Sequence, residues 1–438
     1  MTRLLCLLSL VALFQPPTRA PAQTPVDSAL FAYVKAIKAF DNHAHPVVPT
    51  RPDEPPDQDF DALPIGGIPP FAFPYRLRPD NPELIAAWRE IFGYPHTDRT
   101  DAHLDELRAL KDRVKRAEGD NYAVWVLDRL GIDVQIANRM AMGGGVAPPR
   151  FRWASFVDPL MLPLSVEAVK RETPDRLDLY PRQTKHLQRY LRDLGLKSIP
   201  ATLDGYLTRV VTPTLENMKR EGAVAVKYEA AYLRPLSFDP TPKAAAARMY
   251  ARGGAPSFAT YKILQDYLFG YIGREAGRLD LAVHIHSSDG AGGYFEARGS
   301  DPMLLENALN DPELRNTKFV IVHGGWPNTR GTMSLMAKPN VFADFSFLGN
   351  MLSAHTLATV LREWISAYPD RILFGSDAYP DNDLVGWEEW GWLGATAGRK
   401  ALAIALTGML LDGEITRNRA EEIARMVMRE NGLALYRI

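Results

Sequence analysis

Four short apolar segments of the chain each end in a residue type that binds metal ions. The first ends in His43-Ala44-His45, and the later three end in His286, His323 and Asp377. Side chains two residues apart in a strand point to the same side, so His43 and His45 can bind one ion together. Imidazole nitrogen and carboxylate oxygen are typical ligands of zinc and similar divalent ions. One such segment is a weak indication, but four in this order predict a metal site built from several strands.

The segments that carry these residues belong to an alternation of strands and helices. Such alternation favours a parallel sheet, and eight strand candidates predict an α/β fold, the (β/α)8 or TIM barrel. In that fold the active site forms at the carboxyl ends of the strands, where every proposed ligand falls. The predicted strands are 37–43, 133–138, 153–157, 223–228, 281–286, 319–323, 341–345 and 371–374. The predicted helices are 82–117, 204–220, 261–276, 302–309, 355–367, 394–411 and 416–431.

Two stretches are longer than a plain barrel requires. Residues 46–120 begin with an irregular region rich in Pro and Asp, and a polar helical segment follows it. Residues 160–200 have the composition of helices. We expect the second stretch to form a helical cap over the active-site face, or alternatively an elaboration of the outer wall. The barrel with both insertions is predicted to occupy residues 23–438 as one domain.

The first 22 residues have the pattern of a secretory signal peptide. Arg3 precedes an apolar stretch over 4–14, and Ala20-Pro21-Ala22 supplies a cleavage site of small residues. The apolar stretch is too short for a permanent membrane anchor, and the alternative is a buried N-terminal helix. Cys6 is the one cysteine and lies in this segment, so the mature chain is predicted to lack disulfides. Export to the periplasm or beyond is the simplest account.

The overall charge gives no reason to expect a polyanionic partner. Lys and Arg number 51 against 52 Asp and Glu, for a net charge of −1. A balanced charge argues against nucleic acid and anionic membranes as partners. The expected partner is a small-molecule substrate, and a homodimer is one expectation because barrels of this kind often pair.

The order of the strand-end residues resembles the amidohydrolase superfamily over nearly the whole mature chain. Three motifs are most similar to the amidohydrolase-2 branch, and within it to FluG-like proteins. They are Asp-Asn-His-Ala-His at 41–45, Val-Lys-Tyr-Glu-Ala-Ala-Tyr at 226–232 and Glu-Asn-Gly-Leu-Ala-Leu-Tyr at 430–436. That branch includes hydrolases and metal-dependent decarboxylases. The resemblance implies one or two divalent ions, with Zn²⁺ as the first expectation.

The resemblance assigns ligands to the first and fifth strands. His43 and His45 would be the paired ligands of the first strand. In the fifth strand either His284 or His286 could reach the ion. We take His286, because it is nearer the strand end and is followed by two serines, as in the family. His284 is then expected to be a deeper residue that packs or supports the ligands.

His323 and Asp377 are the expected catalytic residues. His323 matches the family's strand-six histidine, which could bind a second metal or polarise the substrate carbonyl. Asp377 matches the strand-eight aspartate, which can both touch the metal and take a proton from its water. The alternative for Asp377 is a helix N-cap in the turn it occupies.

Lys227 ends the fourth strand, where binuclear members of the superfamily carry a carboxylated lysine. The carbamate would be anionic and could bridge two ions. An unmodified ammonium cannot bind a metal and would instead bind an anionic substrate group. A third alternative is a buried lysine paired with Glu229 or another acid.

Five further residues are weaker candidates for substrate contacts. Arginine forks bind carboxylates, and aromatic rings could form an apolar wall, but each residue is equally well explained by barrel packing. They are Arg139, Arg152, Tyr232, Arg234 and Trp326. The loops expected to shape the pocket are 46–80, 139–152, 160–200 and 378–393.

The leading hypothesis is a secreted hydrolase that uses a metal-activated water to cleave an amide, ester or lactone bond. The alternative is a metal-dependent, non-oxidative decarboxylase of an aromatic or unsaturated carboxylic acid, which an unmodified Lys227 would favour. A binding protein on a decayed barrel is a third class. It is disfavoured because no expected ligand is missing, and fold alone would not decide among the three.

Overall fold

Eight parallel strands follow one another in chain order in a single sheet. The computed structural model describes residues 26–50, 55–63, 74–172, 176–288 and 296–438, so the predicted signal peptide lies outside the described residues. The strands are β1 (Ala39–Ala44), β2 (Ile132–Asn138), β3 (Phe151–Phe156), β4 (Ala223–Tyr228), β5 (Ala282–His286), β6 (Phe319–Val322), β7 (Val341–Asp344) and β8 (Ile372–Leu373). All eight lie within two residues of a predicted strand.

The first and last strands meet and nearly close the sheet into a barrel. The backbone N–H of Asn42 donates to the Phe374 carbonyl at 2.8 Å, and the N–H of Asp377 donates to the His43 carbonyl at 2.8 Å. The predicted (β/α)8 barrel is therefore confirmed. Closure also brings the loop after β8 onto the carboxyl end of β1, where the first two predicted ligands lie.

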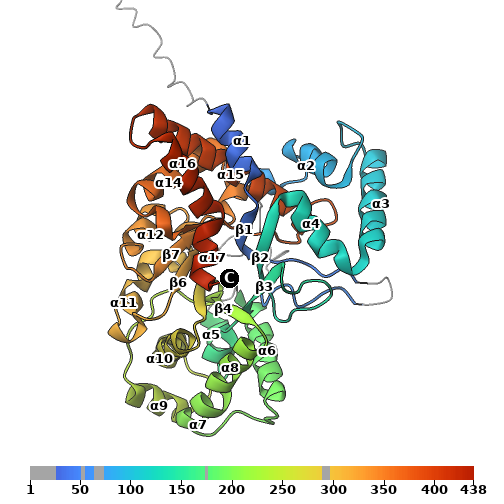
Figure 1. The fold of residues 1–438 in the computed structure, drawn as a ribbon. Helices are drawn as coiled ribbons and strands as arrows, with labels where there is room; N and C mark the ends of the chain where they lie inside the picture. Colours follow the sequence, from blue (N-terminus) through green and yellow to red (C-terminus); the bar gives the residue numbers. More distant parts are fainter. Residues whose placement is uncertain (1–25, 51–54, 64–73, 173–175, 289–295) are drawn as a thin grey trace, which may run out of the picture.

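Helices surround the barrel, as Figure 1 shows. Most of them connect the carboxyl end of one strand to the amino end of the next, which parallel strands require. Among the described helices, none combines the length and apolar character needed to cross a bilayer. The helices are α1 (Ser28–Ala36), α2 (Glu83–Phe92), α3 (Asp101–Glu118), α4 (Tyr122–Leu130), α5 (Glu167–Glu172), α6 (Leu179–Asp193), α7 (Leu203–Tyr206), α8 (Thr212–Arg220), α9 (Lys243–Arg252), α10 (Phe258–Arg278), α11 (Glu306–Leu309), α12 (Thr329–Leu335), α13 (Leu348–Met351), α14 (Ala354–Ala367), α15 (Trp387–Leu411), α16 (Arg417–Arg425) and α17 (Asn431–Tyr436).

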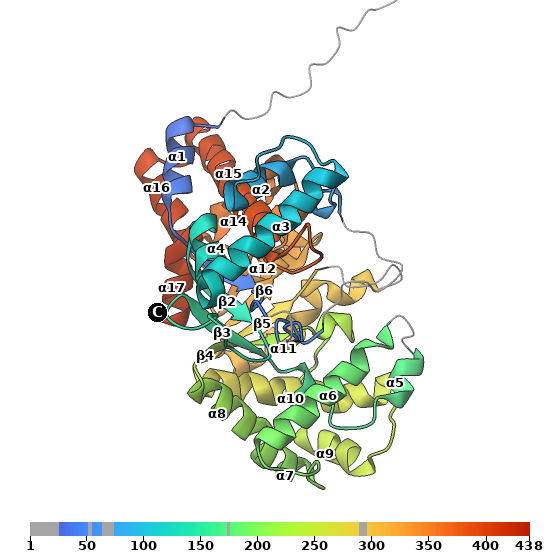
Figure 2. The ribbon, with the colours of Figure 1, turned by 90° about the vertical axis from the view of Figure 1, so that its right-hand side faces the viewer.

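The helix α17 fills the amino end of the barrel. Its Leu435 packs in an apolar cluster with Val320 and Leu373. The ring of Tyr436 stacks on Phe40, near the start of β1, with ring centroids 5.6 Å apart. Figure 1 shows α17 lying across the strands near the centre of the molecule, and the turned view of Figure 2 places it to one side of them. The opposite, carboxyl end is therefore the end left for a site.

Residues 160–200 are largely helical, and α6 contacts that carboxyl end. The hydroxyl of Tyr190 in α6 donates to the carbonyl of Phe156, the last residue of β3, at 2.7 Å. His186 of the same helix makes a hydrogen bond of 3.0 Å to the carbonyl of Ala62. Figure 2 shows α5 and α6 on the side of the strands away from α17. The helix α6 also lies along the outer wall, where Asp193 and Leu194 line a groove with Asn217 and Glu221 at the end of α8.

Two of the differences from the predicted helices have a clear local cause. The segment 82–117 is two helices, because Gly93 takes a left-handed conformation (φ 73°) and ends α2. The helix α15 begins at Trp387 rather than at residue 394, inside a stretch predicted to be a pocket loop. The Glu389 carboxylate accepts a hydrogen bond of 2.8 Å from the Gly386 N–H and so caps this helix earlier than its apolar pattern indicates.

Candidate metal centre

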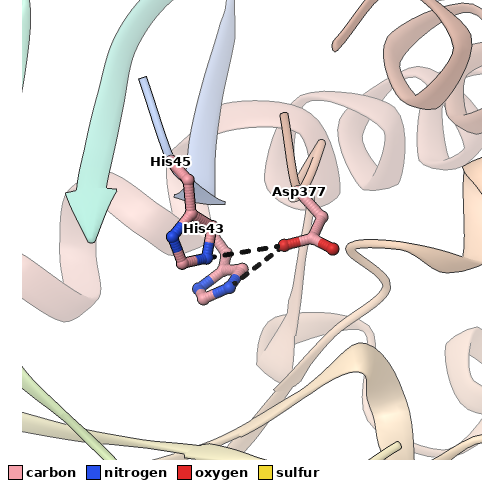
Figure 3. A group of neighbouring side chains, drawn as sticks. All are labelled: His43, His45 and Asp377. Carbon is pink, nitrogen blue, oxygen red and sulfur yellow. Dashed lines mark ion pairs between the residues drawn. The ribbon is translucent and has the colours of Figure 1, made fainter. Parts of the chain in front are cut away.

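Three predicted ligands meet where β1 ends, as Figure 3 shows. Asp377 Oδ1 lies 3.2 Å from His43 Nε2 and 3.9 Å from His45 Nε2. A backbone hydrogen bond of 2.7 Å from the His45 N–H to the Ala378 carbonyl holds the two segments in this register. One ligand atom from each of the three residues lies within 4.8 Å of the others, and all three side chains are buried. This spacing is suited to a single ion held between two imidazoles and a carboxylate.

Two of the predicted catalytic residues have an unusual backbone conformation. His323 and Asp377 have φ values of 62° and 52°, in the left-handed region that residues with a Cβ atom rarely adopt. Such backbone outliers cluster at functional sites, where the surrounding structure holds them. The turn after His323 also requires glycine: a Cβ on Gly324 would lie 2.4 Å from the ring of Trp364. The fold thus holds both residues in place against a local energetic cost.

Lys227 reaches the same centre from β4. Its Nζ lies 3.2 Å from His43 Nε2, and the residue is 1% exposed. Burial lowers the pKa of the Lys227 ammonium, while the carboxylates of Glu229 and Asp377 act to raise it. The structure therefore places Lys227 beside the ligand group, with an amine that is easier to deprotonate than that of an exposed lysine.

The two histidines of β5 face different partners. The ring centroid of His286 lies 4.7 Å from that of His323, and the Tyr232 hydroxyl lies 3.3 Å from His286 Nδ1. His284 Nε2 instead lies 2.6 Å from the Tyr436 hydroxyl of α17. The structure thus directs His286 toward the centre and His284 toward the plugged end of the barrel.

Three buried carboxyl groups near the centre were not predicted as site residues. They are Asp61, which precedes α2, Asp158, which follows β3, and Glu229, which follows β4; each is at most 3% exposed. Burial raises the pKa of Asp158 to about 7, and burial together with the Asp61 charge raises the pKa of Glu229 well above its ordinary value. The positions of Asp158 and Glu229 just beyond strand ends were a usable signal. Asp61 follows no strand, and the sequence offered no sign of it.

The comparison with protein families decides what kind of chain carries this centre. A model of the amidohydrolase family matches residues 214–438, just over half of the chain. The chain belongs to the amidohydrolase family. The predicted amidohydrolase-2 branch is confirmed, and the FluG-like subgroup remains a prediction. None of the curated proteins searched matches the sequence.

Solved structures share the fold of this amidohydrolase. Glucuronate isomerase from Caulobacter crescentus has a TM-score of 0.61 at 14% identity, over 93% of each chain. A protein from Lactobacillus casei ATCC 334, described as a candidate metal-dependent hydrolase, has a TM-score of 0.59 at 15% identity, over 94% of this chain and 98% of its own. Uronate isomerase from Thermotoga maritima has a TM-score of 0.54 at 13% identity, over 94% and 98%. At these identities the likeness extends to the fold alone.

The amidohydrolase is a metal-dependent enzyme by family, and its residues fit a divalent ion. Burial lowers the pKa of His45 and, more strongly, that of His43, so both imidazoles are neutral and have a lone pair to offer. His43 Nδ1 is buried and has no hydrogen-bond partner among the described residues. Two neutral imidazoles and a carboxylate form the donor set that zinc and similar ions prefer.

The weaker substrate candidates of the amidohydrolase are not brought together. Tyr232 is in the site, beside His286. Arg139 forms a buried ion pair of 2.8 Å with Asp57, and Arg234 one of 2.8 Å with Asp266. Both guanidinium groups are therefore committed to partners within the protein.

The other two candidates lie away from the ligands. Arg152 is the second residue of β3 and so lies toward the amino end of the barrel. Trp326 lines an outer groove of about 480 Å³ with Arg330 and His355. Tyr232 is the one of the five whose contacts support a role at the centre.

Proposed function

We propose that this amidohydrolase is an exported, metal-dependent hydrolase that cleaves an amide, ester or lactone bond with an activated water. The observation that carries the proposal is the convergence of His43, His45 and Asp377 at the carboxyl end of a closed barrel. A site with two neutral nitrogens and one carboxylate, beside further histidines, is suited to hold a hydrolytic ion. Zn²⁺ is the ion we propose.

The residues divide into those that hold the ion and those that move protons. His43, His45, His286 and Asp377 would hold one ion, and a carboxylated Lys227 would help to hold a second. A divalent ion supplies Lewis acidity, which polarises a scissile carbonyl and makes a water acidic near neutral pH. Asp377 would accept a proton from the attacking water and return it to the leaving group. His323, which follows β6, lies beside His286 at the centre, with ring centroids 4.7 Å apart. The aromatic ring of Tyr379, 5.5 Å from the ring of His45, walls the centre on the side of the β8 loop.

The second candidate function is decarboxylation of an aromatic or unsaturated acid. The observation that favours it is the buried Lys227 ammonium, 3.2 Å from His43 Nε2, which could bind a substrate carboxylate. Opposing it is the burial of Lys227, which lowers the pKa of this side chain and so disfavours the charged form that would bind a carboxylate. Hydrolysis is therefore the preferred proposal.

The metal content of the Lys227→Met variant separates the two functions. We expect about two equivalents of metal in the parent enzyme, produced with bicarbonate and mixed divalent ions, and about one in the variant. The physical reason is that burial favours the neutral Lys227 amine, which can add CO2 and release a proton to give a bridging carbamate. Plasma mass spectrometry measures the metal.

Lys318→Met, at the amino end of β6, is the matched control and should leave the metal content unchanged. About one equivalent in both the parent and the Lys227 variant would remove Lys227 from the metal and place decarboxylation level with hydrolysis.

Export is the second part of the proposal. Residues 1–22 are proposed to be removed, so N-terminal sequencing of protein recovered from the periplasm or medium should begin at Gln23. Replacing Leu7 and Leu8 with Arg should trap the precursor inside the cell, because a charged segment cannot serve as the apolar core of a signal peptide. Recovery of the full-length chain outside the cell would contradict cleavage at this site.

A further inference from the structure

A buried carboxylate organises the polar groups that lie behind the metal centre. Asp344, the last residue of β7, is fully buried. Its Oδ1 accepts hydrogen bonds from the His323 N–H at 2.9 Å, the Ser346 N–H at 3.1 Å and the Ser346 hydroxyl at 2.5 Å. Its Oδ2 accepts from Asn42 Nδ2 at 2.7 Å. Four donors on two oxygens are the environment of an ionised carboxylate, which accepts and cannot donate.

The direction of these hydrogen bonds determines which nitrogen of His323 carries the proton. The Ser346 hydroxyl uses its hydrogen on Asp344, so its oxygen can only accept from His323 Nδ1, 2.9 Å away. The Ser346 carbonyl, 3.3 Å from the same nitrogen, is also an acceptor. Both partners of Nδ1 thus require an N–H at that atom. Among the described residues no carboxylate forms an ion pair with the His323 ring, which packs against His43 and His286, so the imidazole is neutral and Nε2 is left with a lone pair.

The hydrogen bonds on the other side of Asp344 lead toward α17. Asn42 donates its amide hydrogens to Asp344, so its oxygen accepts from the Tyr436 hydroxyl at 2.5 Å. The Tyr436 oxygen then accepts from His284 Nε2 at 2.6 Å, which assigns the proton of His284 to Nε2. His284 Nδ1 is buried without a hydrogen-bond partner among the described residues. The donor order therefore runs from His284 through Tyr436 and Asn42 to Asp344.

We propose that Asp344 is a positioning residue that, through the Ser346 hydroxyl, holds His323 as the Nδ1–H tautomer with Nε2 as an acceptor. The sequence is compatible with two roles for His323, metal binding or polarisation of the substrate carbonyl, and this tautomer excludes the second. A neutral imidazole with a bare Nε2 can bind a metal or take a proton, but it cannot donate a hydrogen bond to a substrate carbonyl. This consequence for the reaction rests on the proposed function, whereas the tautomer itself does not.

The test is the tautomer of His323 in metal-free protein labelled with 15N-histidine. Long-range ¹H–¹⁵N correlation distinguishes a protonated from a bare ring nitrogen, and a His323→Gln variant assigns the signal by its loss. We expect protonation at Nδ1 in the parent and in Ser346→Thr, which keeps the hydroxyl. In Ser346→Ala we expect a mixture of both His323 tautomers. We also expect its zinc affinity, measured by chelator competition, to be lower than that of the parent by about 10–100-fold. A parent protonated at Nε2, or an alanine variant identical to the threonine variant, would overturn the proposal.

Asp344→Asn is a second test, and its readout is a different histidine. The two backbone N–H groups keep the amide oxygen at the Oδ1 position, so the new NH2 group faces Asn42. Asn42 must then turn its oxygen toward residue 344 and its NH2 group toward Tyr436. The Tyr436 oxygen then accepts from the Asn42 NH2 group, and the Tyr436 hydroxyl donates its hydrogen to His284 Nε2. We expect the proton of His284 to move from Nε2 to Nδ1. An unchanged His284 tautomer in the folded variant would show that Asp344 does not set the donor order.

Both tautomer measurements, of His323 and of His284, use protein without metal or substrate. An unexpected tautomer would therefore not contradict the proposed hydrolase function. Equally, an absence of hydrolytic activity would not contradict the proposed tautomer.

Discussion

Asp377→Asn should lower hydrolytic turnover by about 10²–10⁴-fold, the contribution typical of a positioned proton acceptor. The amide keeps an oxygen that can face His43 and His45, but it has no basic site for the proton of the attacking water. The effect should therefore fall on kcat. The measurement is the steady-state rate on whichever ester, lactone or amide of a substrate panel the parent enzyme cleaves.

Two controls separate proton transfer from other causes. Asp381→Asn changes a half-buried aspartate of the same loop, which is hydrogen-bonded to its neighbour Asn382, and should leave the rate unchanged. Metal content must be measured alongside, because Asp377 belongs to the ligand group. Activity above about a tenth of the parent in a metal-loaded Asp377→Asn enzyme would rule out the proposed role.

Lys111→Met should destabilise the protein by about 3–5 kcal/mol, the cost of leaving a buried charge without its partner. Lys111 Nζ in α3 lies 2.8 and 3.0 Å from the two oxygens of Glu389 in α15, and both side chains are at most 5% exposed. The same ammonium donates to the Asp383 carbonyl at 2.9 Å. Lys111 thus ties the insertion after β1 to the loop that carries Asp377. Urea unfolding followed by circular dichroism gives the change in free energy.

The matched control is an exposed ion pair. Lys170 lies 3.1 Å from Glu167, whose side chain is 61% exposed, so Lys170→Met should cost less than about 1 kcal/mol. The double variant Lys111→Met with Glu389→Gln should recover much of the loss, because it removes the unpaired charge. A Lys111→Met protein as stable as the Lys170 variant would show that the pair does not hold α3 in place.

The sequence was sufficient to predict the barrel and the convergence of His43, His45 and Asp377 at one end of it. These features are local: an apolar strand, its terminal ligand and the following turn are all within a few residues. The ion pair of Arg139 with Asp57 could not be predicted, because its acid lies in an irregular stretch with no periodicity. Asp344 had a signal, since it is one of only three acids in the predicted strands, with Asp41 and Asp133, but its partners lie far away along the chain. Asn42, for example, is 302 residues from Asp344.

The position of Tyr436 has a consequence for the order of folding. Tyr436 contacts Asn42 across 394 residues of sequence, the longest separation among the hydrogen bonds described around the centre. A nascent chain that has emerged past Asp377, in the loop after β8, already contains every proposed ligand, yet it lacks α17 and the hydroxyl that orients His284. Contacts of such high sequence separation form late, because loop closure must come first. A partly synthesised chain would therefore hold metal poorly, and full metal loading would follow the docking of α17.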